Sequence, residues 1–241
     1  MTTPHSPAAS TRSPQLKAVS LRQQAREALR TRIVLGQIEP GRVESVINIA
    51  SELGVSVTPV REAVMDLANL GMVEIIRNRG FRVPVLTDHD LEEIFCLRTM
   101  LEVPAMVQLA GLAERAPVTR FRQFAEQITD AAREGDLVSF LDLDRQFHIG
   151  LLELLGNRRL VDMVGQLRDQ ARMEGLQKLA DQGELTQSCE EHIAIVDAVA
   201  AGNAELTEEL VRKHLTHSRG IWAGRTEDGG PAEDGRTEDG T

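Results

Sequence analysis

Four titratable side chains are the residues of this chain best suited to bind a metal ion. Asp144 and His148 lie four residues apart in the segment LDLDRQFHIG, so on a helix they share one face. His192 and His214 follow in two later segments, each with apolar neighbours at helical spacing. One carboxylate and three imidazoles suit a borderline divalent cation such as zinc, nickel or manganese, so these four residues are candidate ligands.

Simpler interpretations of these residues stay open on spacing alone. A histidine among apolar neighbours can be a hydrogen-bonded core residue, and Asp144 with His148 can be an ordinary surface pair on one helix. His217 competes with His214, because it lies three residues further on and nearly on the same face. A metal with an open position could also activate water for hydrolysis, but Glu191, beside His192, points about 100° away on its helix and offers no evident general base.

Helices would position these side chains, because residues 88–222 show almost no strand pattern. Glycines separate six helical segments, which we expect at 88–114, 118–134, 136–155, 158–181, 184–201 and 203–222. Short connections between long amphipathic helices favour up-and-down packing, and such bundles build ligand sites from facing helices. The C-terminal part of the chain is therefore predicted to be an all-α antiparallel bundle.

The N-terminal part has the pattern of a winged helix-turn-helix. Leu21, Ala25, Leu29 and Ile33 form a helical stripe that ends at Gly36, and 47–53 predicts a short second helix closed by Gly54. A third helix begins within GVSVTPVREAV and stops at Gly71, leaving Val57, Thr58 and Arg61 outward on its leading turn.

A small β-hairpin wing is predicted after the third helix. Segments 73–76 and 81–85 alternate around Asn78-Arg79-Gly80, which places arginines at the tip. The fold class is therefore mainly α, with this wing on the N-terminal domain. Residues 16–86 carry ten Lys and Arg against seven Asp and Glu, whereas the whole chain has a net charge of −10. DNA affinity must then come from one local face, doubled by dimerisation.

The N-terminal spacing, the TPVREAV segment, Gly71 and Gly80 together resemble the GntR family of bacterial transcription regulators. The resemblance implies that Ser56, Arg61 and Gly80 face DNA, and we add Val57, Thr58 and Arg79 to the expected DNA-binding set. Many relatives carry a basic residue where this chain has Val57 or Ile47. The departure removes two possible contacts to guanine or phosphate, so the family's common operator should not be assumed.

The C-terminal motifs D-x-x-F-H and E-H-x-x-I, with a histidine in the last segment, resemble the FCD effector domain of the FadR-like branch of that family. The resemblance implies that Asp144, His148, His192 and His214 are metal ligands, and it favours His214 over His217. Six helices are more typical of the VanR-type subgroup.

A small organic acid is the expected effector. Four protein ligands leave one or two positions of an octahedral metal open, and a carboxylate could replace water there. Arg98 could clamp the acid's free oxygens; the alternative is a salt bridge from Arg98 to Glu102 across one turn. We expect the protein to be a homodimeric regulator, and specifically a repressor, that binds palindromic double-stranded DNA. We do not expect it to be an enzyme. A metal-responsive regulator without an organic effector is the alternative.

The expected domain plan has four parts. Disordered segments are predicted at 1–15 and 224–241, the DNA-binding domain at 16–86 and the helical domain at 87–223. Cys96 and Cys189 lack metal-site spacing and are expected to be packing residues on helices. Neither a charged-then-apolar leader nor an apolar run of about 18 residues occurs, so the sequence predicts a cytoplasmic protein, at the nucleoid when bound to DNA, without membrane contact.

Overall fold

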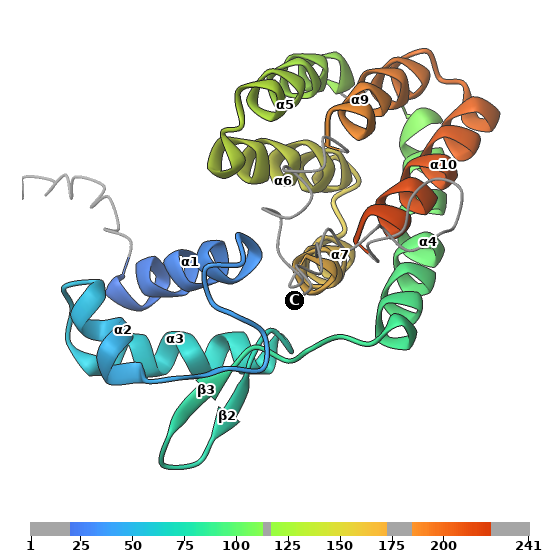
Figure 1. Cartoon of the computed structure of the whole chain (residues 1–241). Helices are drawn as coiled ribbons and strands as arrows, with labels where there is room; N and C mark the ends of the chain where they lie inside the picture. The colour runs from blue at the N-terminus through green and yellow to red at the C-terminus, as the bar shows by residue number, and fades with distance from the viewer. Residues whose placement is uncertain (1–19, 113–116, 173–184, 223–241) are drawn as a thin grey trace, which may run out of the picture.

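The computed structural model describes residues 20–112, 117–172 and 185–222 (Figure 1). The segments predicted to be disordered, 1–15 and 224–241, lie outside these residues. The N-terminal domain consists of helices α1 (Leu21–Val34), α2 (Val46–Glu52) and α3 (Val57–Asn69) and strands β1 (Val43–Glu44), β2 (Glu74–Ile76) and β3 (Gly80–Arg82). The strands form one antiparallel sheet in the order β1-β3-β2. The predicted winged helix-turn-helix is confirmed.

Helix α1 packs against α3 through the predicted stripe, with one exception. Ala25, Leu29 and Ile33 are buried, whereas Leu21 is 54% exposed. The periodicity correctly identified the face, but the first turn of α1 extends beyond the edge of the core. Ser20 caps this turn by accepting a hydrogen bond from the backbone N–H of Gln23.

Helix α3 begins at Val57, after Ser56 as its N-cap residue. Pro59 is thus the third residue of the helix, a position where the missing N–H has no intrahelical acceptor in any case. Val60, Val64 and Leu67 are buried on the inner face, as their spacing predicted. The inner face of α3 packs against the core, and this packing fixes the position of the first turn of the helix.

The wing is a three-stranded sheet rather than a simple hairpin, because the two-residue strand β1 joins its edge. So short a strand has no periodicity that could have revealed it. Gly80 has a φ of +138°, and a Cβ at this position would lie 1.9 Å from the carbonyl oxygen of Glu44. Only glycine fits there, since β1 and β3 approach closely at this point.

The helical domain follows the predicted segments closely. Its elements are α4 (Asp88–Ala110), a 3-10 turn (Val118–Arg120), α5 (Phe121–Glu134), α6 (Leu137–Glu153), α7 (Arg158–Ala171), α9 (Leu185–Ala200) and α10 (Ala204–Trp222). The all-α bundle is confirmed (Figure 1). Helix α4 ends before the expected 114, and the last part of the helix expected at 158–181 lies outside the described residues.

Two further expectations concern the cysteines and the membrane. Cys189 is fully buried, as expected, but Cys96 is exposed on α4, so the packing role predicted for it is wrong. Leu91, Ile94, Phe95 and Arg98 form the buried face of this part of α4, and Cys96 falls outside that face. Among the described residues, no helix combines the length and apolar character needed to cross a bilayer.

Candidate metal centre and DNA interface

Three histidines from three helices meet in the interior of the bundle. His148 comes from α6, His192 from α9 and His214 from α10, and they are 7%, 2% and 3% exposed. One ring nitrogen from each lies within 4.8 Å of the others. The Nε2 atoms of His148 and His192 are 2.9 Å apart. Packing of α6, α9 and α10 thus assembles a set of nitrogen donors from residues that are far apart in the sequence.

The hydrogen bonds of the other ring nitrogens orient two of these histidines. His192 Nδ1 donates to the backbone carbonyl of Cys189 at 3.1 Å, and His214 Nδ1 donates to Glu191 Oε2 at 2.9 Å. Each bond leaves the Nε2 lone pair directed away from its partner and available to a cation. Metal-binding histidines are commonly held in this way by a carbonyl or carboxylate.

Asp144 connects the histidines to a group of buried arginines. Its Oδ1 lies 3.6 Å from His148 Nε2 and 3.5 Å from His192 Nε2. Its Oδ2 accepts hydrogen bonds from Arg168 Nη2, at 3.0 Å, and from Arg172 Nη2. One oxygen of the carboxylate therefore faces the candidate metal position while the other is held by guanidinium groups.

The buried arginines also engage Glu102 on α4. Arg98 Nε donates to Glu102 Oε1 at 2.7 Å, and Arg168 Nη1 donates to Glu102 Oε2 at 3.0 Å. The salt bridge weighed as the alternative role for Arg98 is therefore formed. Arg168 and Arg172 were missed by the sequence analysis. Their spacing of four residues was visible, but charged residues at that spacing usually mark a solvated face of a helix.

Burial and neighbouring charges set the protonation of the cluster. Burial, with the positive charge of Arg168, holds the pKa of His148 well below its usual value, and burial lowers the pKa of His214 to about 4. Burial disfavours ionisation of Asp144, but Arg172, His148 and Arg168 outweigh it and keep its pKa well below the ordinary value. Neutral imidazoles beside a carboxylate are the protonation states that a divalent cation requires.

Glu191 has a positioning role that the sequence did not indicate. It does point away from His192, but it holds both histidines of α10: His214 on Oε2 and His217 on Oε1, the latter at 3.3 Å. Burial opposes its ionisation, yet these hydrogen bonds lower its pKa to about 2. So acidic a carboxyl is a poor general base. His217 lies on the far side of Glu191, outside the group of three.

The residues present fit a divalent cation. The donor set of three imidazole nitrogens beside one carboxylate oxygen matches the preferences of zinc, nickel and manganese. His148, His192 and His214 would hold the ion, with Asp144 adjacent through Oδ1. A bound cation would supply a Lewis-acidic position at which a carboxylate oxygen can bind.

The expected DNA-contacting residues divide into two groups. Ser56, Thr58 and Arg61 are exposed at the start of α3, and Arg79 is exposed at the tip of the wing. Val57 does not face fully outward, because its side chain packs partly against the core. Gly80 is half-buried, and its contact with β1 explains the glycine without reference to DNA.

Comparison with known proteins identifies the class. Residues 21–83 match the model for the gntR family of bacterial regulatory proteins, and residues 93–217 match the FCD domain. A probable D-xylose utilization operon transcriptional repressor from Paenarthrobacter nicotinovorans is 30% identical over 210 residues, covering 84% of this chain and 89% of that protein. The chain is a DNA-binding transcription regulator and belongs to the GntR family, with a C-terminal FCD domain.

Solved structures agree with this assignment. Escherichia coli McbR/YncC is 25% identical, with a TM-score of 0.75 over 85% of this chain and 98% of that one. A putative GntR regulator from Rhodococcus sp. RHA1, 24% identical with a TM-score of 0.70, shares the fold over the same fractions of the two chains. The relatives are named as transcriptional regulators rather than enzymes, which removes the hydrolase interpretation.

Proposed function

We propose that this regulator is a homodimeric repressor whose operator affinity changes when a small organic acid binds at a divalent metal in the helical domain. The observation that carries this proposal is the buried cluster in which Asp144 faces two histidines with Oδ1 and two arginines with Oδ2. A cation bound by the histidines and an anion bound by the arginines would be neighbours across a single carboxylate.

The arginines supply the positive surroundings that an acid needs. Arg98, Arg168 and Arg172 are all less than 7% exposed. Within the described residues, Arg168 Nε is a buried polar atom without a hydrogen-bond partner, so the group has a donor in reserve. Guanidinium groups match carboxylates in geometry, and burial strengthens the pairing because water does not screen it. In this proposal Arg98, which is paired with Glu102, adds its guanidinium to the positive charge of the group.

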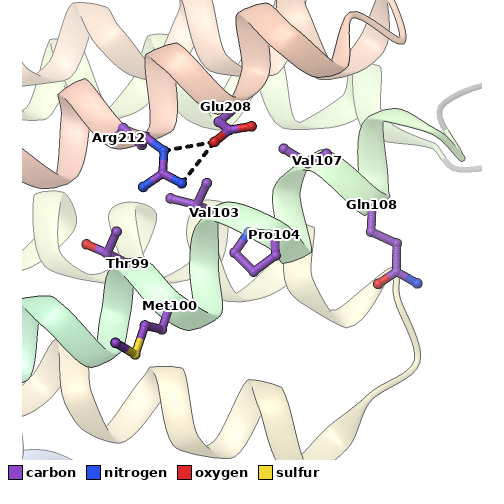
Figure 2. A pocket seen from close by; sticks show the side chains of 8 residues that line it. All are labelled: Thr99, Met100, Val103, Pro104, Val107, Gln108, Glu208 and Arg212. Carbon is purple, nitrogen blue, oxygen red and sulfur yellow. Dashed lines mark hydrogen bonds and ion pairs between the residues drawn. The ribbon is translucent and has the colours of Figure 1, made fainter.

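A second copy of the chain is proposed to pack on the outer face of α4 and α10. Leu97 and Met100 are 48% and 65% exposed on α4, which is unusual for large apolar side chains on a single stripe. A groove of about 500 Å³ between α4 and α10 is lined by residues that include Met100, Pro104 and Arg212. Figure 2 shows Val103 of α4 beside the ion pair of Arg212 and Glu208 on α10. A homodimer would cover this surface and would present two reading helices to a palindromic operator.

The repressor role is supported by the printed name of the Paenarthrobacter relative, which describes a repressor. A protein that binds an operator acts where the bacterial chromosome lies, so we place it in the cytoplasm.

A thermal-shift screen of organic acids tests the proposal, with the protein stripped by chelator and then loaded with zinc, nickel or manganese. We expect at least one acid to raise the melting temperature of the loaded protein only, because a ligand that binds the native state stabilises it by mass action. The same acid should change the affinity for an operator duplex selected from a random pool. Acids without effect on either measurement would contradict the effector role.

A metal-responsive regulator without an organic effector is the second candidate. One observation favours it: both oxygens of Asp144 and both oxygens of Glu102 already have partners, so the carboxylates of the cluster are satisfied without an acid. In that case operator affinity would follow metal loading alone. The operator assay on loaded and stripped protein, with no acid added, distinguishes the two candidates.

A further inference from the structure

Helix α7 presents its two sides to different parts of the molecule. Arg168 and Arg172 reach Asp144 in the candidate metal centre. Gln166, Asp169 and Gln170, on the other side of the same helix, contact the DNA-binding domain. Figure 1 shows α7 between the bundle and the N-terminal helices. One rigid helix therefore joins the buried cluster to the domain that reads DNA.

The glutamines of α7 bind the end of the recognition helix. Gln166 Nε2 donates to the backbone carbonyl oxygen of Leu70 at 3.2 Å, and Gln170 Nε2 donates to the same oxygen at 2.8 Å. Leu70 is the C-cap residue of α3. The last carbonyls of a helix have no intrahelical donor and need an outside partner. The effector domain provides that partner to α3.

The turn after α3 is shaped for this contact. Gly71 has a φ of +70°, and a Cβ at this position would lie 2.5 Å from Gln170 Nε2. A side chain at position 71 would therefore push the Gln170 amide away from Leu70. Glycine serves two requirements here, the left-handed backbone that ends the helix and the close approach of α7.

A buried ion pair holds the same two domains together. Arg30 Nη1 of α1 donates to Asp169 Oδ1 of α7 at 3.1 Å, and Arg145 of α6 donates to the same oxygen at 3.1 Å. Asp169 is 4% exposed. The ion pair and the glutamine contacts fix both α1 and α3 to one face of α7, so the DNA-binding domain cannot turn without breaking them.

We propose that Gln166 and Gln170 are positioning residues for DNA reading: they hold α3 at one orientation relative to the helical domain and so set the separation of the two reading helices in a dimer. The inference rests on the homodimer of the proposed function. Because Arg168 and Arg172 lie on the same helix, a change of their contacts at Asp144 would move this attachment as well.

The test measures the preference of the full-length protein for half-site spacing. An operator is selected from a random duplex pool with the wild-type chain, and a second duplex carries the same half-sites separated by two additional base pairs. The readout is the dissociation constant for the lengthened duplex divided by the dissociation constant for the selected duplex. In Q166A/Q170A we expect this ratio to fall at least about five-fold, the low end of typical coupling between sites. Loss of fold alone would weaken both duplexes equally and leave the ratio unchanged.

The matched control is Q123A/Q127A, which removes two exposed glutamines four residues apart on α5 and should keep the wild-type ratio. If Q166A/Q170A fails to fold by circular dichroism, the single variant Q170A, which removes the shorter bond, replaces it. A spacing preference that survives in the folded variant overturns the inference alone. A wild-type chain that shows no spacing preference overturns the dimeric reading of the proposed function together with this inference.

Discussion

Arg30 in the DNA-binding domain and Asp169 in the helical domain form a buried ion pair, with Nη1 and Oδ1 3.1 Å apart. The side chains retain only 10% and 6% of their exposure. Burial disfavours the charge on Arg30, but Asp169 and Glu27 outweigh it, and the pKa of Arg30 is raised. Arg30 therefore stays charged, and loss of Asp169 would leave its buried guanidinium with the partly exposed Glu27 as partner.

Replacement of Asp169 by asparagine should lower the free energy of unfolding by about 1–3 kcal/mol, since Arg30 loses a buried charged partner but keeps Glu27. Denaturant unfolding measures the change. D66N is the matched control, because Asp66 pairs with Arg22, whose side chain is 50% exposed; an exposed pair contributes about 0–1 kcal/mol. Equal effects of the two substitutions would show that the interdomain pair adds nothing.

Replacement of Arg61 by alanine should weaken operator binding by about 1–3 kcal/mol, because this exposed residue of the leading turn of α3 is in position to reach a base edge. Fluorescence anisotropy with a labelled operator duplex measures the loss. The control is R159A, which removes an exposed arginine from α7 in the helical domain. Arg61 would be excluded from the interface if R61A, folded by circular dichroism, bound as tightly as the wild type.

The metal centre predicts that H148A and H192A each lower metal content and lose most of the thermal stabilisation that zinc gives the stripped wild type. At a free zinc concentration of 100 times Kd, that stabilisation should be about 2.7 kcal/mol. H89A serves as control, because the His89 side chain is 80% exposed at the start of α4. Elemental analysis and thermal shift are the measurements. Zinc uptake unchanged in both variants would assign the histidines a purely structural role.

Glu191 is predicted to orient His214 for the metal. E191Q should therefore lower zinc affinity by about 10- to 100-fold, the usual effect of losing a carboxylate that holds a metal-binding histidine. Competition with a chromophoric chelator measures the affinity. E190Q changes the neighbouring residue, which is exposed, and should leave zinc affinity at the wild-type value. An affinity of E191Q equal to that of E190Q would mean that His214 needs no such partner.

The sequence by itself determined the local elements of both domains. Ala25, Leu29 and Ile33 revealed the inner face of α1, and the four-residue spacing of Asp144 and His148 placed them on one face of α6. Such patterns lie within one or two helical turns, where geometry relates sequence spacing directly to direction in space. The sequence did not predict the short strand β1 or the exposure of Leu21, because both depend on the packing of neighbouring elements.

Tertiary structure alone decided what surrounds these residues. Arg168 reaches Asp144 across 24 positions and Glu102 across 66, and Arg30 reaches Asp169 across 139. No periodicity encodes such pairs, because they depend on how helices pack rather than on spacing within one helix. An arginine spaced for a solvated face can therefore lie in the core, if carboxylates from other helices compensate its charge.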